Sequence, residues 1–454
     1  MNKKLHNYQR MKKHLLLLLL TVCSTSLGAQ EIPTSFSLQE AVEWGMNYNR
    51  TLQRASIELQ KAHKEKWRTI SIGFPQINAN MMYQNFIEQP VSLIPAQFFG
   101  GNEGEFSEIT FGTQQTAMGS VELSQLLFDG TYVIGVQGIR HYIETAENVL
   151  EKTQLEIKKA VITSYINVLV ARKSLQVLED NALALNKNIE EVHQLYRNGF
   201  AEEESVEQLR LTLADLNAQI RFAEKGVLLA DNVFKLLLGI DIIENPALSE
   251  SLEEITTRYL LGGDNTKDYA NNIDIRLAQN NVTQETFLYR LEKAKGLPSF
   301  TAFLNGSYMG NSNEFTFTDR DQKWFGSASF GLRLRIPVFS SFGRAAGTQK
   351  TKLSLLQAET ELIEVKSQVF VAWQNAKNKV SLAKENLATS RERLALAERI
   401  ADKNNTKFFE GLNSSFELRQ AQLQLYQAQQ NHIQSMKQLI VEKTHLDILI
   451  NNAQ

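Results

Sequence analysis

YRNGFAEEESVEQLRLTLADLNAQ, residues 196–219, lies near the middle of the chain, and FFEGLNSSFELRQAQLQLYQAQ, residues 408–429, has the same design near its end. In each stretch an aromatic residue is followed three positions later by glycine, then by a short polar run and a segment rich in leucine, alanine and glutamine. Glycine tolerates the left-handed conformation that ends many helices, so each stretch predicts a tight turn between two helices. The two glycines, Gly199 and Gly411, are 212 positions apart, which indicates an internal duplication.

The helices that flank these turns have a seven-residue apolar period. After the first turn, its two rows consist of Val206, Leu213, Ile220, Val227 and Phe234, and of Leu209, Leu216, Ala223, Ala230 and Leu237. This pattern is typical of coiled-coil packing and predicts antiparallel helical hairpins. Residues 131–197 contain no proline, and a continuous helix of that length would reach roughly 100 Å at 1.5 Å per residue. Residues 348–408 predict a second helix of about 90 Å.

Four other segments alternate apolar and polar residues instead: 77–86, 119–128, 300–310 and 325–339. Each is close to the length that a tilted membrane strand requires, and aromatic residues near the ends are typical of membrane interfaces. A soluble, half-buried hairpin would show the same alternation, and the aromatic residues favour the membrane. We expect Glu122, Arg333 and Arg335 to face a barrel lumen, where charge is tolerated. There they would bias solute passage or only keep the lumen hydrated.

The duplication extends beyond the turns. NRTLQRA (49–55) aligns with NIDIRLA (272–278), and FPQINA (74–79) aligns with LPSFTA (297–302), both 223 positions apart. The offset falls to 212 at the turns, so the loop at residues 89–116 is the longer of the two strand-to-strand loops. We therefore divide the chain into a first repeat, 30–250, and a second repeat, 251–454. Each has the order helix, strand, loop, strand, long helix, tip, long helix.

The N-terminus predicts a secretory signal peptide, residues 1–29, with cleavage after Ala29. It has a Lys-Lys pair, a short leucine core and a small-residue end, and either Met1 or Met11 fits as the start. Cys23 is the only cysteine, and it is either discarded with the signal or acylated as in a lipoprotein. No later stretch approaches 18 consecutive apolar residues, so no transmembrane helix is expected.

Composition and motifs argue against nucleic-acid binding and catalysis. The net charge is −2, so there is no basic field for nucleic acid. The patterns HExxH, CxxC, GxxxxGK[ST] and GxSxG are absent, and the seven histidines are scattered. We therefore expect no enzymatic activity, no cofactor and no metal, with histidines either in contact with solvent or in helix seams.

The two turn motifs and the proline-led strands FPQINA and LPSFTA resemble the TolC family of outer-membrane efflux proteins over essentially the whole mature chain. The resemblance implies a homotrimer and a mainly α fold with a membrane β-barrel portion. Its long antiparallel coiled-coil helices form a periplasmic α-barrel, and four strands per chain contribute to a shared 12-stranded barrel. An independent consideration agrees, because membrane barrels begin at about eight strands and open edges in lipid would leave backbone groups unpaired.

The resemblance also implies a function. The protein would be an outer-membrane exit duct of a tripartite efflux or secretion system. It would conduct substrates passively after docking to a periplasmic adaptor and an inner-membrane pump of the RND or ABC type. The alternative is a periplasmic coiled-coil adaptor or scaffold, which would show one hairpin embedded in a β-rich lipoyl-like domain. Two hairpins and strands of membrane length favour the duct, which needs no substrate pocket of its own.

The tips are the expected docking surface for the adaptor. The residues implied there are Tyr196, Gly199, Phe408, Gly411, Leu412, Ser414 and Ser415. The acidic run at 202–204 is either a docking patch for a basic partner or a set of charges that favour a helix N-terminus.

The resemblance further places a periplasmic gate six and nine residues after the second tip glycine, at Glu417 and Gln420. Glu417 is either one acidic ring of the gate or an exposed residue beside the Leu418–Leu425 seam. The equivalent positions of the first tip, Ser205 and Gln208, are uncharged. The ionic lock of some relatives is missing because Asn413 and Ser205 occupy its positions, so closure must depend on other contacts.

Overall fold

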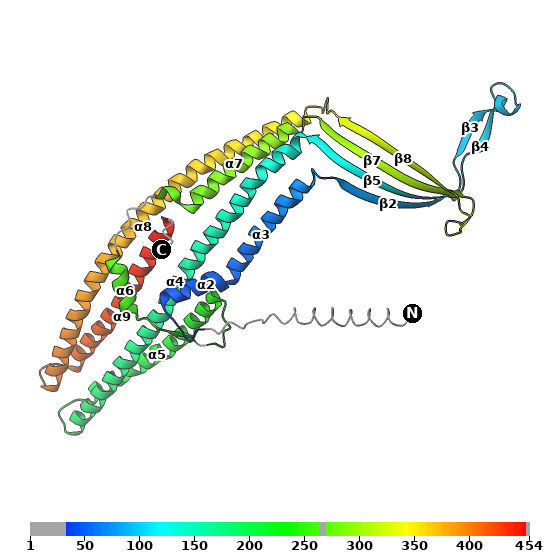
Figure 1. The fold of residues 1–454 in the computed structure, drawn as a ribbon. Coiled ribbons are helices and arrows are strands. Elements are labelled where there is room, and N and C mark those ends of the chain that lie inside the picture. Colours follow the sequence, from blue (N-terminus) through cyan, green and yellow to red (C-terminus); the bar gives the residue numbers. More distant parts are fainter. Residues whose placement is uncertain (1–32, 245, 263–268, 451–454) are drawn as a thin grey trace, which may run out of the picture.

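The computed structural model describes residues 33–244, 246–262 and 269–450. The predicted signal peptide, its cleavage site and Cys23 lie outside these residues. The described chain is elongated: a β-sheet forms one end, two helical hairpins form the other, and short helices lie about half-way between them (Figure 1). Helices account for 68% of the described residues. None of the described helices is long and apolar enough to cross a membrane.

The order of elements is repeated in the two halves of the chain. The first half contains β1 (Ser35–Phe36), α2 (Leu38–Tyr48), α3 (Arg50–Ser71), β2 (Gln76–Asn85), β5 (Gln115–Asp129), α4 (Gly130–Arg197) and α5 (Glu203–Leu238). The second half contains β6 (Ala247–Leu248), α6 (Leu252–Leu261), α7 (Ile273–Ala294), β7 (Ser299–Ser312), β8 (Trp324–Arg335), α8 (Gly343–Phe409) and α9 (Ser415–Leu449). Between β2 and β5 lie β3 (Val91–Pro95), the short helix η1 (Ala96–Phe99) and β4 (Phe106–Thr110), and the turn η2 (Tyr269–Asn271) precedes α7.

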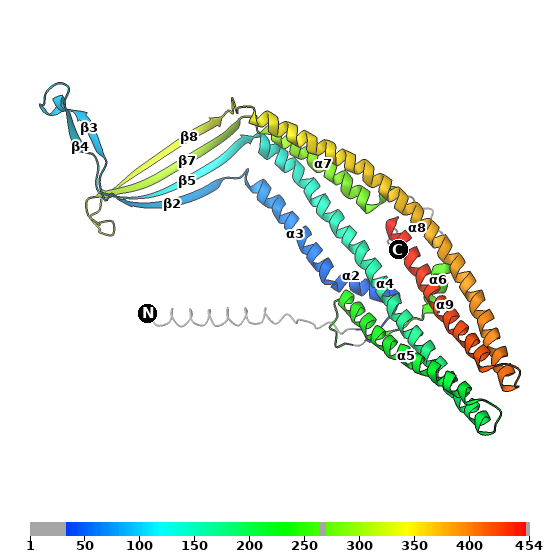
Figure 2. The same ribbon diagram turned by 180° about the vertical axis from the view of Figure 1, so that it is seen from behind.

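The long helices are continuous, as their proline-free sequences predict. Helix α4 has 68 residues and α8 has 67. Helix α8 begins at Gly343, five positions before the predicted start, directly after Phe342 in a left-handed conformation. Both helices bow along their length, so that each half follows one curved path from the sheet to its tip (Figure 2).

The predicted seven-residue rows of α5 form a buried seam with α4. Val206, Leu209 and Leu216 are buried with residues of α4 in one apolar cluster near the tips. Phe234 belongs to a second cluster at mid-length, where α2, α4, α5, α6, α8 and α9 meet around the buried Tyr165. Burial raises the pKa of Tyr165 to about 12, and its hydroxyl donates to the Phe36 carbonyl at 2.9 Å. The buried seam between α4 and α5 thus continues from the tips into the cluster at mid-length.

Two buried asparagines join the starts of α3 and α7 to the ends of α5 and α9. Asn49 caps α3 by accepting from Thr51 N, and its Nδ2 donates to the Leu237 carbonyl at 2.7 Å. Asn272 caps α7 and donates to the Leu449 carbonyl at 2.8 Å in the same way. Each amide therefore begins one helix and satisfies a carbonyl at the end of another, which fixes the end-to-end junction in each half.

We expect Asn272→Ala to lower the free energy of unfolding by about 2–3 kcal/mol, the sum of a lost helix cap and an unsatisfied buried carbonyl. Thermal unfolding of the purified protein, followed by circular dichroism, measures the loss. Asn198→Ala is the matched control, because the Asn198 side chain is exposed and donates to Gln194 O of the preceding helix turn. Equal melting temperatures for the two variants would contradict the junction role of Asn272.

The sheet is antiparallel with the order β2-β5-β7-β8. Its register separates an apolar face from a polar one, because directly paired residues point to the same side. The exposed apolar face carries Ile77, Met81, Tyr83, Val121, Leu304, Tyr308, Phe330, Leu332 and Leu334. Strand β8 ends at Arg335, so the prediction of a strand to residue 339 is wrong. Ser341 and Phe342 have positive φ values of 48° and 63°, which turn the chain into α8.

Candidate functional site

The two tips have nearly the same backbone. Gly199 has a φ of 79° and Gly411 a φ of 74°. In the first tip Gly199 N donates to Tyr196 O at 2.9 Å, and in the second Gly411 N donates to Phe408 O at 3.0 Å. The positive φ agrees with the sequence prediction. A Cβ at either glycine would meet no group of another segment within 4 Å. A side chain there is disfavoured by backbone conformation alone.

The structure places the expected docking residues in three different settings. Tyr196 and Leu412 are accessible, with 38% and 70% of their surface exposed. Ser414 is the exposed N-cap of α9 and Ser415 is its half-buried first residue. Phe408 is only 9% exposed and packs into the apolar cluster beneath the tips, so its assignment to the docking surface is corrected. It supports the tip from inside.

Sequence reasoning missed two exposed aromatic residues at the tips. Phe200, directly after the first glycine, is 81% exposed, and Phe416 is 57% exposed with the Arg419 guanidinium 5.5 Å from its ring centre. Neither belongs to an apolar row that faces the hairpin seam. That mismatch between an apolar residue and the helical period was the signal that could have identified them.

Glu417 is bound to the start of its own helix. Its carboxylate accepts from Ser414 N at 2.9 Å, and Glu417 N donates to Ser414 Oγ at 3.3 Å. This reciprocal pair is a capping box, and the sequence pattern Ser-x-x-Glu could have predicted it. Gln420 is exposed one turn further on. The gate role of both residues stays a prediction, because a single protomer does not place them around an axis.

If Glu417 forms an acidic ring of the gate, Glu417→Gln should lower cation selectivity and weaken block by multivalent cations from the periplasmic side. Three carboxylates in a narrow, hydrated constriction would focus a negative potential, and the substitution removes it. Stability should change little, since glutamine also completes a capping box. Single-channel conductance in planar bilayers is the measurement. Unchanged selectivity and unchanged block would remove Glu417 from the gate and leave it only its capping role.

The acidic run of the first tip lies at the start of α5. Glu202 is the N-cap without a side-chain cap bond, and Glu203 and Glu204 occupy the first turn. Negative charge in that position favours the helix, so the location agrees with the local interpretation. All three carboxylates are exposed and therefore also accessible to a basic partner.

Uncharged amides connect the two hairpins where an ionic lock is missing. Asn181 Nδ2 of α4 donates to Gln429 Oε1 of α9 at 2.9 Å, and Asn188 Nδ2 of α4 donates to Asn405 Oδ1 of α8 at 3.4 Å. Asn413, at the lock position, bonds instead to Asn404 of its own hairpin at 2.6 Å. These hydrogen bonds between the hairpins therefore join neutral groups, and they lie beside an apolar cluster that spans both hairpins.

The sheet register brings the expected lumen residues to one face. Glu122 lies opposite Asn78 and Asn305, on the face that also carries Arg333 and Arg335. The Arg333 guanidinium lies 5.1 Å from the ring centre of Phe303, whose ring also covers Gly331 on the neighbouring strand. All three charged residues are thus opposite the apolar face, which supports the prediction that they face a lumen.

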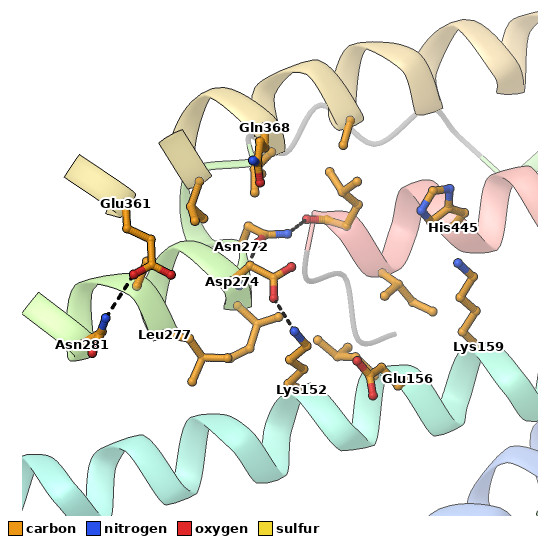
Figure 3. Close-up of a pocket in the computed structure, with 18 residues that line it drawn as sticks. Lys152, Glu156, Lys159, Asn272, Asp274, Leu277, Asn281, Glu361, Gln368 and His445 are labelled. Carbon is orange, nitrogen blue, oxygen red and sulfur yellow. Dashed lines mark hydrogen bonds and ion pairs between the residues drawn. The ribbon is translucent and has the colours of Figure 1, made fainter. Parts of the chain in front are cut away.

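A pocket of about 760 Å³ lies where the end of α9 meets the start of α7, between α4 and α8 (Figure 3). Four of its polar side chains form pairs: Lys152 contacts Asp274 at 2.7 Å, and Asn281 donates to Glu361 at 3.3 Å. Burial and the nearby Lys159 charge lower the pKa of His445. The pocket is a helix junction and not a convergent set of reactive groups.

Two histidines of the described helices have local partners. His141 contacts Glu144 at 3.2 Å and stacks on Phe287, and His432 lies 3.1 Å from Ser390 Oγ in the α8–α9 seam. Burial lowers the pKa of His432. Among the described residues no group of three or more His, Cys, Asp or Glu side chains could hold a metal ion.

Comparison with known proteins agrees with this architecture. A family model described as outer membrane efflux protein matches residues 268–452. None of the curated proteins searched matches the chain.

Several solved structures share its fold. The structure of CusC, described in connection with folding and transmembrane channel formation, is 16% identical, with a TM-score of 0.73 over 94% of this chain and 95% of that one. The CmeC outer membrane channel of Campylobacter jejuni is 15% identical, with a TM-score of 0.72 over 91% and 85%. The open MtrE outer membrane channel of Neisseria gonorrhoeae is 15% identical, with a TM-score of 0.68 over 94% and 93%. The matching family model covers the second repeat, and the family that it describes is the one that the sequence resembles.

Proposed function

We propose that this chain is one protomer of an outer-membrane exit duct. Its sheet would contribute to a barrel in the outer membrane, and its hairpins would form a tunnel through the periplasm. One observation carries the proposal: a four-stranded sheet with one exposed apolar face continues directly into helices of 68 and 67 residues. Such a sheet fits lipid on one side and an aqueous lumen on the other.

The open sheet supports assembly from several copies. Strands β2 and β8 are its edge strands, and each has one edge without a partner in the described chain. Unpaired backbone groups are costly in lipid, so β2 of one copy should pair with β8 of the next. Three copies of four strands would make a barrel of twelve, within the range of membrane barrels. We therefore propose a homotrimer.

The tips support docking to a periplasmic partner. They are the end of the molecule furthest from the sheet, and they expose Phe200, Leu412 and Phe416 (Figure 1). Exposed apolar groups at the end of a rod are typical of an interaction surface. We propose that an adaptor hairpin binds there and couples the duct to an inner-membrane pump. The duct itself would be passive, with the pump selecting the cargo.

The alternative, a periplasmic adaptor, predicts one hairpin within a β-rich domain. The described chain has two hairpins and one amphipathic sheet, which favours the duct. Detergent extraction of the full chain distinguishes the two functions. A duct should give a trimeric band that heating dissociates, together with ion conductance in planar bilayers. A water-soluble monomer without conductance would contradict the duct.

A further inference from the structure

The hairpin formed by β3 and β4, with η1 at its turn, is absent from the second repeat and projects from the outer end of the sheet (Figures 1 and 2). We call residues 87–112 the outer arm. Strands β3 and β4 pair only with each other, from Val91 opposite Thr110 to Pro95 opposite Phe106. An isolated two-stranded hairpin is marginally stable in water. The arm therefore has two open strand edges and no sheet behind it.

The arm exposes apolar side chains that its own fold does not cover. Phe98 and Phe99 are 78% and 63% exposed, and the other exposed apolar residues are Ile87, Val91, Leu93, Phe106 and Phe111. The corresponding loop of the second repeat differs. There Phe315 and Phe317 pack against Tyr83 at ring distances of 5.8 Å, so that loop folds back on the sheet. Phe315 keeps 61% of its surface exposed, so the arm differs from that loop in having more exposed apolar side chains and no sheet to pack on.

The charge of the arm has one sign. Glu88, Glu103, Glu105 and Glu108 are exposed, and the arm contains no lysine, arginine or histidine. Among the described residues none of the four carboxylates forms an ion pair, and that of Glu105 accepts a 3.5 Å bond from Asn102. The loop of the second repeat instead mixes Asp319 and Asp321 with Arg320 and Lys323. The arm thus combines an apolar surface with an uncompensated negative field.

We propose that the outer arm is a docking site for a basic, extended segment of another protein, which adds as a strand to an open edge of the β3–β4 hairpin. Strand addition would pair the free backbone groups, and apolar residues of the segment would cover the exposed phenylalanines. Lysine or arginine on the segment would complement the four carboxylates. An anionic lipid surface does not fit this charge, and a second copy of the arm would oppose like charges. The location of the arm outside the cell rests on the proposed function.

The test uses the purified full-length trimer and a short synthetic peptide that alternates lysine and valine. We expect the peptide to bind the wild-type protein, and to bind it more weakly as the salt concentration rises. Its affinity for the triple variant Glu103→Gln/Glu105→Gln/Glu108→Gln should be roughly tenfold lower than for wild type. Phe98→Ser/Phe99→Ser should weaken binding even at high salt. The matched control is Glu202→Gln/Glu203→Gln/Glu204→Gln, an equally acidic triple at the opposite end of the molecule, which should leave peptide binding unchanged.

Three results would overturn the proposal. The first is equal binding by wild type and the arm triple variant, or equal loss in the tip triple variant. The second is comparable binding of a glutamate–valine peptide. The third is binding of wild type to phosphatidylglycerol vesicles that requires Phe98 and Phe99, which would identify a membrane as the occupant. Conductance of the same arm variants in planar bilayers should equal that of wild type. Absence of conductance in wild type itself would contradict the duct and leave the peptide result standing.

Discussion

On the proposed function, Gly411→Val should eliminate coupling to the pump while leaving a folded trimer in the outer membrane. At a φ of 74° a β-branched side chain is strongly disfavoured, with a strain of about 1–3 kcal/mol. No neighbouring atom lies within 4 Å of a Cβ at this position, so the strain can be relieved only by a change in the tip backbone. That change moves Leu412 and Phe416 together, and these are the exposed apolar groups of the second tip. Resistance to exported drugs, or secretion of cargo, is the readout.

Gly239→Val is the matched control for Gly411→Val. Gly239 also has a positive φ, 73°, but a Cβ there would lie 2.5 Å from the Tyr48 carbonyl oxygen. A backbone oxygen inside the packed middle of the helical region cannot move aside, so this variant should fail to assemble. Two similar left-handed glycines would thus give opposite phenotypes, loss of coupling at the tip and loss of the trimer at mid-length. Wild-type coupling of the Gly411→Val trimer to its adaptor would show that the tip is not the docking site.

Asn181→Leu should shift the resting channel toward its open state, on the proposed function. The substitution removes the donor of the 2.9 Å bond to Gln429 between the two hairpins and leaves the apolar packing around it in place. One such bond contributes about 1 kcal/mol, so three protomers acting together should change the closed-to-open ratio roughly a hundredfold. The measurement is the mean conductance of single channels in planar bilayers.

Asn413→Ala is the control for Asn181→Leu. It removes the bond to Asn404, which also joins two amides but lies within one hairpin, so the resting conductance should stay low. The wild-type closed state should in addition resist high salt, because neutral hydrogen bonds are screened far less than ion pairs. A resting conductance in Asn181→Leu equal to that of Asn413→Ala would show that the amide bonds do not hold the hairpins closed.

Local patterns were sufficient to predict the elements and their faces. The period of seven in α5 follows from the 3.6 residues per turn of a helix, and the alternation in β2 and β8 follows from the two-residue period of a strand. For the same reason the sequence could assign Glu122, Arg333 and Arg335 to one face before any register was known. The sequence did not identify Phe408 as buried, because an aromatic residue at the end of a helix fits the surface and the seam equally well. Only its burial in the apolar cluster that also contains Leu418 decided between them.

The sequence by itself determined the duplication, the left-handed glycines of the two tips, the continuous long helices and the two faces of the sheet. Each of these depends on residues within a few turns of one another, or on the repetition of such a segment. The tertiary structure alone decided the Asn49 and Asn272 junctions, the amide bonds between hairpins and the projection of the outer arm. Those contacts join residues 177 to 248 positions apart, or depend on a hairpin finding no surface to pack on. No local period contains that information, because a side chain's partner depends on how two distant segments are brought together.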